Sequence, residues 1–223
     1  MKKIFISRDL DEGSVFKKML TERGFEVADN SLVEFLAVPN ISVPSADWVF
    51  FYSKNAVRFF CQAVGLRTSK HHKTAALGPG TAEAMRAAGV LPDFVGDGDP
   101  ISTAEAFLKV AKGSRVLFPR ASESRQSVQR ILAGQIESLD LVVYENIAKR
   151  EFQVPDCQSL VFTSPLNAKA YFSKYRFREE EVIAIGQTTA ACLRQLNITG
   201  YKVAEFPSEK ALAELVISLL GDG

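Results

Sequence analysis

Histidine is scarce in this chain of 223 residues, since His71 and His72 are the only two and they are adjacent. Neighbouring side chains of a helix or strand point in different directions, and no partner stands at metal-ligand spacing. Two such histidines also cannot build a Ser-His-Asp or Cys-His catalytic arrangement. The sequence therefore predicts no resident metal and no conventional hydrolase mechanism.

Cysteine is equally sparse, with Cys61, Cys157 and Cys192 scattered along the chain and no CxxC pair. This usage is typical of a reducing compartment, where such residues are small buried hydrophobes. No apolar run reaches the ~18 residues of a membrane span, and the first apolar stretch is too short for a signal peptide. We expect a cytoplasmic protein without a membrane partner.

An excess of one charge is also missing, because 27 basic and 26 acidic residues leave a net charge of +1. Nucleic-acid binders usually carry a basic excess or stripe, so no nucleic-acid partner is predicted. A polyanionic ligand would have to be bound by local donors. Gly78-Pro79-Gly80 is not a dinucleotide fingerprint, and no P-loop pattern occurs.

What the chain does contain is an alternation of two patterns. Apolar runs typical of strands occupy 3–7, 48–52, 74–77, 115–118, 140–144, 159–163 and 182–185. Apolar residues at helical spacing occupy 12–23, 54–64, 81–88, 102–111, 124–133, 166–174, 188–196 and 208–220. Strands that are apolar on both faces and alternate with helices predict an α/β fold with doubly wound parallel sheets.

Three motifs recur in the same order at nearly one spacing. The pairs are Lys3-Ile4-Phe5-Ile6-Ser7-Arg8 with Arg115-Val116-Leu117-Phe118-Pro119-Arg120, the segments around Ser53 and Ser164, and Ala76-Leu77-Gly78 with Ala184-Ile185-Gly186. Their offsets are 112, 111 and 108 residues. This regularity predicts a duplication with two similar domains.

Polar residues recur where these strands end and the next helices begin, which is where open parallel sheets bind ligands. The candidate substrate-binding residues are Arg8, Ser53, Gly78, Thr81, Arg120, Ser164, Gly186, Thr188 and Thr189. Helix starts and hydroxyls of this kind hold carboxylates or phosphates. The same Ser and Thr residues also fit plain helix caps, as do Ser164-Pro165, Ser208 and a Ser102–Glu105 capping box.

Taken together, these residues resemble the uroporphyrinogen-III synthase family of tetrapyrrole (heme) biosynthesis, end to end. The resemblance rests on Ser7-Arg8, Tyr52-Ser53-Lys54-Asn55-Ala56-Val57, Leu77-Gly78-Pro79-Gly80-Thr81-Ala82, Val116-Leu117-Phe118-Pro119-Arg120, Val143-Tyr144-Glu145, Phe162-Thr163-Ser164-Pro165, Ala184-Ile185-Gly186-Gln187-Thr188-Thr189-Ala190 and Phe206-Pro207-Ser208. The chain departs from the family pattern at Lys54 and Gln187, where proline is common, and at Glu181, where some relatives carry lysine.

The resemblance implies two flavodoxin-like domains with the active site in a cleft between them. One domain would combine 1–36 with 148–223, and the other would span 40–142. The short linkers would lie at about 36–40 and 142–148. A monomer is expected.

The resemblance further implies a lyase that needs no cofactor or metal. The family cyclises hydroxymethylbilane to uroporphyrinogen III by losing the terminal hydroxyl as water, which leaves an azafulvene. A spiro intermediate at the substituted position of ring D then fragments and recloses with ring D inverted. Tyr144 matches the family's favoured acid for the departing hydroxyl, while Arg8 and Arg120, the latter followed by Arg125, would pair with substrate carboxylates. A transient contact with the enzyme that supplies the substrate is also implied.

Two other interpretations remain open from the residues alone. A non-catalytic, bilobed cytosolic binding module for a small polycarboxylate would use the same donors, and fold alone cannot decide between them. A flavodoxin-like mononucleotide binder is disfavoured, because Asp9, Asp11 and Glu12 would stand near its phosphate.

Overall fold

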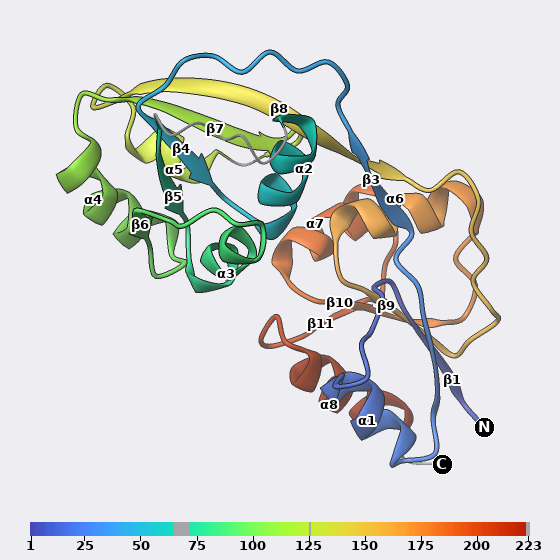
Figure 1. Ribbon diagram of the computed structural model, residues 1–223. Coiled ribbons are helices and arrows are strands. Elements are labelled where there is room, and N and C mark those ends of the chain that lie inside the picture. The colour runs from blue at the N-terminus through green and yellow to red at the C-terminus, as the bar shows by residue number, and fades with distance from the viewer. Residues whose placement is uncertain (65–71, 125, 222–223) are drawn as a thin grey trace. The chain divides into compact units, whose positions relative to one another are not determined.

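The computed structural model describes residues 1–64, 72–124 and 126–221, so the predictions involving His71 and Arg125 lie outside the described residues. The chain divides into two compact units, which we call unit 1 (Met1–Glu34 with Ile147–Gly223) and unit 2 (Phe35–Asn146). Figure 1 labels their helices and strands. The chain passes between the units twice, within strand β3 (Val33–Ala37) and within strand β8 (Glu137–Ala148), and these two strands are neighbours in one sheet.

Unit 1 contains a five-stranded, all-parallel sheet in the order β11-β10-β9-β1-β2. Its elements are β1 (Lys3–Ile6), α1 (Val15–Thr21), β2 (Glu26–Asp29), β9 (Ser159–Phe162), α6 (Pro165–Lys174), β10 (Glu181–Ala184), α7 (Gln187–Gln195), β11 (Lys202–Val203) and α8 (Glu209–Leu220). Alternate residues of β9 face opposite sides of the sheet. Leu160 and Phe162 pack with α6 and α7, whereas Val161 packs with α1 and α8.

Unit 2 contains a six-stranded sheet in the order β3-β8-β7-β4-β5-β6. Its other elements are β4 (Trp48–Phe51), α2 (Lys54–Val64), β5 (Lys73–Ala76), α3 (Pro79–Ala87), β6 (Phe94–Val95), α4 (Pro100–Ala111), β7 (Arg115–Ala121) and α5 (Ser127–Ile131). Trp48 and Phe50 pack with α4 and α5, and Val49 and Phe51 pack with α2 and α3. Both sheets are thus mainly parallel and covered on both faces, which confirms the predicted α/β class.

Apart from the added edge strand β3, the two sheets share one topology in permuted form. Counted from β4 in unit 2, and from β9 through to the N-terminal strands in unit 1, both sheets read 3-2-1-4-5. In this count the strands whose sequences recur occupy matching positions. The matching pairs are β4 with β9, β5 with β10, and β7 with β1. The permuted order explains why the repeats are regular while unit 1 is built from both ends of the chain.

The predicted helix starts are partly confirmed. Ser164 and Ser208 cap α6 and α8, since each hydroxyl accepts a hydrogen bond from the backbone N–H three residues on. The capping box at Ser102 is wrong, because Asp99 is the cap and the helix begins at Pro100. Asp99 stands directly before Pro100, and a proline is favoured at the first helical position because it has no N–H that would need an acceptor there. The helix therefore begins at Pro100, and Ser102 lies inside its first turn.

Helices α3 and α7 also begin earlier than predicted. Their caps are Gly78 and Gly186 rather than the threonines that follow, so Thr81 and Thr189 lie within the first turn. Thr188 lies in the first turn of α7 as well.

Four short or marginal strands carry no clear apolar run, and the sequence did not predict them. They are β2, β3, β6 and β11, and each is an edge strand of its sheet. Edge strands keep one side exposed, so they need fewer apolar residues than the central ones. In the opposite sense, β8 is longer than the predicted 140–144 and α5 is shorter than the predicted 124–133.

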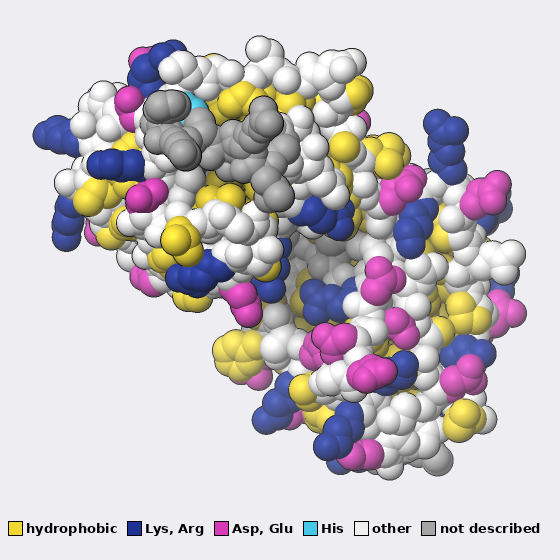
Figure 2. All heavy atoms as spheres, viewed as in Figure 1, with side chains coloured by type: hydrophobic (Ala, Val, Ile, Leu, Met, Phe, Trp, Pro, Cys, Tyr) yellow, Lys and Arg dark blue, Asp and Glu magenta, His cyan; other side chains and the backbone are white. Residues whose placement is uncertain are grey.

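Three further findings concern the surface, the cysteines and the length of the helices. On the face shown in Figure 2, basic and acidic side chains lie intermixed, in line with the balanced composition. Cys61, Cys157 and Cys192 are all free thiols, and Cys192 is buried. No helix within the described part of the chain is long and apolar enough to cross a bilayer.

Candidate active site

Ser53 and Tyr144 come together at the carboxyl edge of the unit 2 sheet. Ser53 follows β4, and its Oγ accepts a hydrogen bond from the Ala56 N–H at 3.2 Å at the start of α2. The Tyr144 hydroxyl lies 3.5 Å from the same Oγ. These two predicted residues, 91 positions apart, therefore share a contact beside a helix N-terminus, which favours negative charge.

A β-bulge decides which way Tyr144 points. In the β7–β8 ladder Arg120 pairs with Val142, but the next residue, Ala121, pairs with Tyr144, so Val143 is the extra residue. Regular alternation would send Val143 and Tyr144 to opposite faces. Both instead join the hydrophobic cluster that includes α2 and α3. The bulge thus turns the phenol toward α2, as bulges beside functional sites commonly do.

Aromatic rings enclose the Tyr144 side chain, which is only 7% exposed. The Phe59 ring of α2 is stacked on it, with centroids 4.9 Å apart and planes inclined by 17°. Phe35 of β3 meets it edge-on at 6.0 Å. The hydroxyl is therefore the polar end of an otherwise packed side chain.

Gly78 and Thr81 lie at the start of α3, after the strand next to the one that Ser53 follows. A Cβ at Gly78 would stand 2.8 Å from the Gly98 Cα, so glycine is required here by the close approach of a neighbouring loop. Thr81 is 9% exposed. In addition, the Lys54 side chain extends from α2 toward α3, with its Cε 3.5 Å from where a Gly80 Cβ would be.

Arg120 is engaged within unit 2. Its Nε donates to Asp140 at 2.7 Å, and its Nη1 donates to the carbonyls of Ala121 and Ser122. Burial alone would raise the pKa of the Asp140 carboxyl, but hydrogen bonds from Arg120, Gln129 and Gln126 outweigh it and hold the pKa below 3.8. The network fastens α5 to β8, and the role of Arg120 as a substrate ligand stays a prediction.

Tyr52 also belongs to the hydrogen-bond network around Asp140, through Gln129, and it lies on the opposite face of the sheet from Tyr144. Its hydroxyl accepts from the Gln129 N–H at 3.1 Å and lies 3.4 Å from Gln129 Oε1. Burial raises the pKa of Tyr52 to about 12. This tyrosine therefore stays protonated at neutral pH and serves to hold α5.

In unit 1, Ser164 occupies the position that Ser53 has in unit 2. Its Oγ accepts from the Asn167 N–H and from the Asn167 side-chain amide, at 3.2 and 2.9 Å. Asn167 Oδ1 in turn accepts from the Leu32 N–H at 2.7 Å. Ser164 thus both caps α6 and anchors the segment after β2.

The start of α7 is the more open rim. A Cβ built on Gly186 meets nothing within 4 Å, in contrast to the crowded Gly78. Thr188 is exposed and makes an interaction of its own, whereas Thr189 is 2% exposed. Within unit 1, the backbone at Gly186 is therefore accessible to a ligand in a way that the side chain of Thr189 is not.

Arg8 lies at the end of β1 and faces α8. Its Nη1 is 3.7 Å from Glu209 Oε1, and the Arg8 side chain is 41% exposed. Glu209 Oε2 also accepts from Ser14 Oγ at 2.7 Å. Burial would raise the pKa of Glu209, but the hydrogen bonds from Ser14 and Phe16 and the charge of Arg8 lower it overall. A ligand at Arg8 would share the guanidinium with this carboxylate.

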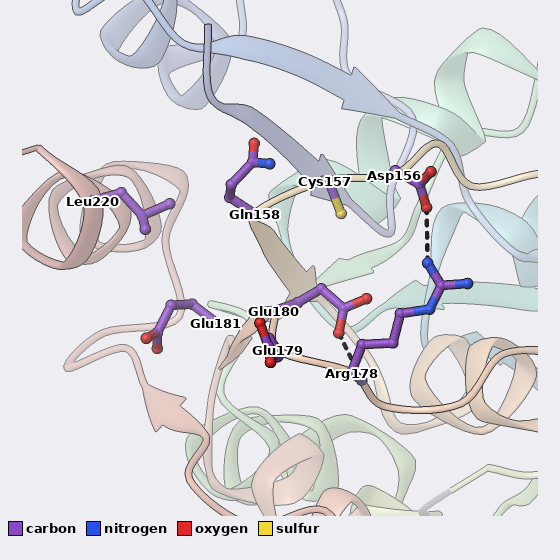
Figure 3. A pocket seen from close by; sticks show the side chains of 8 residues that line it. All are labelled: Asp156, Cys157, Gln158, Arg178, Glu179, Glu180, Glu181 and Leu220. Atoms are coloured by element: carbon purple, nitrogen blue, oxygen red, sulfur yellow. Dashed lines mark hydrogen bonds and ion pairs between the residues drawn. The ribbon is translucent and has the colours of Figure 1, made fainter. Parts of the chain in front are cut away.

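A hollow on unit 1, about 770 Å³ in volume, lies at the opposite edge of its sheet (Figure 3). Its walls come from the amino ends of β9 and β10 and include Asp156, Glu179, Glu180 and Glu181, with Arg178 as the cation among its lining residues. An acidic hollow repels a polycarboxylate. Glu181, the departure from the family pattern, begins β10 and so lies away from the carboxyl-edge residues.

No group of three or more His, Cys, Asp or Glu side chains suited to a metal ion occurs among the described residues. Phe59 was not predicted to be a site residue, although it lies on a predicted helix. An apolar residue at helical spacing looks like any core residue, so the sequence carries no signal for its contact with Tyr144.

These features define an α/β protein of two permuted, doubly wound units, with hydroxyls, helix starts and one tyrosine at the carboxyl edges of the sheets. A family model described as Uroporphyrinogen-III synthase HemD matches residues 14–214. The chain therefore belongs to this family, which confirms the resemblance seen in the sequence.

Solved structures agree. A crystal structure titled uroporphyrinogen-III synthetase from Helicobacter pylori 26695 is similar with a TM-score of 0.72 and 26% identity, covering 98% of this chain and 100% of that one. A mutant uroporphyrinogen III synthase from the extremely thermophilic bacterium Thermus thermophilus shares the fold, with a TM-score of 0.54 and 17% identity over the full length of both chains. A search of curated proteins found no match.

Proposed function

We propose that this chain has the activity for which its family is named: it cyclises hydroxymethylbilane to uroporphyrinogen III, with inversion of ring D and loss of water. The observation that carries the proposal is that the Tyr144 hydroxyl lies 3.5 Å from Ser53 Oγ at the carboxyl edge of a sheet, in a member of this family. Such a phenol can donate a proton to a departing hydroxyl.

In the proposed reaction, Tyr144 donates its proton as the C–O bond of the hydroxymethyl group breaks, and water leaves. The resulting azafulvene carbon accepts an electron pair from the substituted position of ring D, which gives the spiro intermediate. The bond between that ring-D carbon and the methylene bridge to ring C then breaks, which leaves a second azafulvene carbon on ring C. This carbon bonds to the free α-carbon of ring D, which gives up its hydrogen as a proton to the Tyr144 phenolate. Overall, the substrate loses the hydroxyl from its hydroxymethyl end and one hydrogen from ring D at the other end, which together make one water. The phenol of Tyr144 is restored.

The protein's remaining task is to control conformation, because the spontaneous closure gives isomer I without inversion. We propose that the carboxylates of the substrate bind at Ser53, Gly78 and Thr81 in unit 2 and at Ser164, Gly186 and Thr188 in unit 1. The buried Thr189 would act through its backbone, whose N–H donates to the Gly186 carbonyl, rather than by touching the substrate. Arg8, and Lys54 beside the start of α3, would add positive charge. Neutral donors hold a flexible polyanion with less ground-state stabilisation than a row of cations would, which leaves binding energy for the transition state.

The test is an isomer assay. Hydroxymethylbilane is generated freshly, mixed with the purified protein without added metal or cofactor, and the oxidised products are separated into type I and type III porphyrins. We expect type III to predominate and to rise with protein concentration. Type I alone, as in buffer, from a protein with a folded circular dichroism spectrum would overturn the proposal. A polycarboxylate-binding module without catalysis would then explain the same donors.

A further inference from the structure

The hydrogen bond between Tyr144 and Ser53 is too long to orient the phenol by itself. At 3.5 Å it lies beyond the 2.5–3.0 Å usual for a hydroxyl pair, so its directional energy is small. The tyrosine ring could still swing about its side-chain torsions unless something fixed its plane. The orientation of the hydroxyl must therefore come from the packing of the ring.

Phe59 supplies that packing. Its ring is nearly parallel to the Tyr144 ring, at a centroid separation of 4.9 Å, and both side chains are almost fully buried. The Arg58 guanidinium lies 4.4 Å from the Phe59 ring centroid, an attractive contact that steadies the phenylalanine in turn. Stacking of this kind sets the plane of a ring more strictly than an aliphatic neighbour does.

The backbone brings the two rings together from both sides. The bulge at Val143 turns Tyr144 toward α2, and Ser53 fixes the start of the helix on which Phe59 lies in the second turn. Without the bulge the phenol would face away from Phe59. The stack therefore depends on a departure from regular strand geometry, of a kind that typically occurs near functional sites.

We propose that Phe59 is the positioning residue for the Tyr144 hydroxyl, acting through the flat contact between the two rings. The inference rests on the proposed function, in which Tyr144 is the proton donor. A displacement of a reacting group by about 1 Å can cost about 100-fold in rate, so a loosened ring is expected to lower kcat while leaving substrate affinity nearly unchanged.

The decisive variant is Phe59→Leu, with Phe60→Leu as its matched control. Phe60 is the next residue of the same helix and is equally buried, but its aromatic contact is with Phe51 rather than Tyr144. We expect Phe59→Leu to lower kcat for type III formation by about tenfold or more with KM changed less than about twofold. Phe60→Leu should retain a kcat close to that of the wild type.

Combining substitutions shows whether Phe59 acts through Tyr144. In a Tyr144→Phe background, Phe59→Leu should have little further effect on kcat, because the group it positions is gone. Equal losses in the two backgrounds, or equal losses from Phe59→Leu and Phe60→Leu, would mean that Phe59 is only a core residue and would overturn the proposal.

A spectroscopic measurement separates this inference from the proposed function. With 3-fluorotyrosine incorporated, the ¹⁹F resonance of residue 144, assigned as the one missing in Tyr144→Phe, should shift or broaden in Phe59→Leu and stay in place in Phe60→Leu. If the wild type makes no type III isomer, the proposed function fails whatever the spectra show. An unmoved resonance in Phe59→Leu would overturn the positioning role even in an active enzyme.

Discussion

Tyr144 is the residue on which the proposed chemistry depends, and its surroundings separate its chemical role from its structural one. The ring is packed by Phe59 and Phe35, while the hydroxyl makes one long contact with Ser53. Removing the oxygen therefore leaves the packing in place. The loss of so long a hydrogen bond costs about 1 kcal/mol of unfolding free energy or less.

We accordingly expect Tyr144→Phe to slow type III formation strongly while the protein stays folded. General acids commonly contribute about 100- to 10,000-fold, so a loss of at least about tenfold is expected even when water substitutes for the phenol. Initial rates and a urea titration measure the two effects. Tyr201→Phe is the control, since that hydroxyl accepts a long hydrogen bond from the exposed Arg194 and belongs to unit 1. An unchanged rate in Tyr144→Phe would remove its proposed role.

At the scale of single elements, α5 is an example of a short helix held by polar contacts. It spans Ser127–Ile131, and its N-cap Gln126 has a left-handed backbone with φ of 51°. Helices this short are not stable alone. The network of Asp140 with Arg120, Gln126 and Gln129 therefore fixes α5 against the end of β8.

Asp140→Asn should weaken this attachment in a pH-dependent way. Because the pKa of Asp140 is lowered in the folded state, its stabilising contribution is present above the ordinary value near 3.8 and is lost as pH falls through the lowered value. Because the Asp140 side chain is 43% exposed and water screens part of its interaction, we expect a loss of no more than about 1 kcal/mol at pH 7, which shrinks progressively below about pH 4. Urea titrations followed by the fluorescence of Trp48 measure it.

Glu137→Gln is the matched control for this prediction. Glu137 pairs with Arg115 on the same two strands at 3.1 Å, and both side chains are exposed. Asp140 is exposed to a similar degree, but its partner Arg120 is only 15% exposed and two glutamines donate to it as well. The loss of the Glu137 pair should cost about 0.5 kcal/mol or less. Equal effects of the two substitutions, or a deficit in Asp140→Asn that does not shrink in acid, would contradict the assigned role of the network.

At the scale of the whole molecule, each hydrophobic cluster lies within one unit. The clusters around Phe50 and Phe51 belong to unit 2, and those around Phe162 and Val161 belong to unit 1. The single tryptophan of the sequence, Trp48, is packed in unit 2. Its fluorescence is therefore a local probe of one core.

Two matched substitutions test whether the cores are stabilised separately. Phe118→Leu in unit 2 and Phe162→Leu in unit 1 change the same residue type at fully buried central strands. Each should cost about 1–1.5 kcal/mol. We expect Phe118→Leu to lower the urea midpoint reported by Trp48, and Phe162→Leu to leave that midpoint unchanged while altering the transition seen by circular dichroism. A shift of the Trp48 midpoint in both variants would show that the molecule unfolds as one unit.

Much of the architecture could be predicted from the sequence because its causes are local. Central strands such as Trp48–Phe51 are buried on both faces and are apolar throughout, and Ser164 and Ser208 cap their helices through atoms three residues away. The edge strands β6 and β11 could not be predicted, because two half-exposed residues leave no periodic signal. The start of α4 was missed because the aspartate before Pro100 is the stronger cap.

The candidate residues divide in the same way. The sequence by itself determined which polar residues follow the strands, since strand and helix periodicity fix where each strand ends. Only the tertiary structure decided that Tyr144 meets Ser53 and Phe59, because a one-residue bulge reverses the face on which every later side chain of the strand lies. It likewise decided that Arg120 is tied to Asp140, a pairing across neighbouring strands that no local pattern encodes.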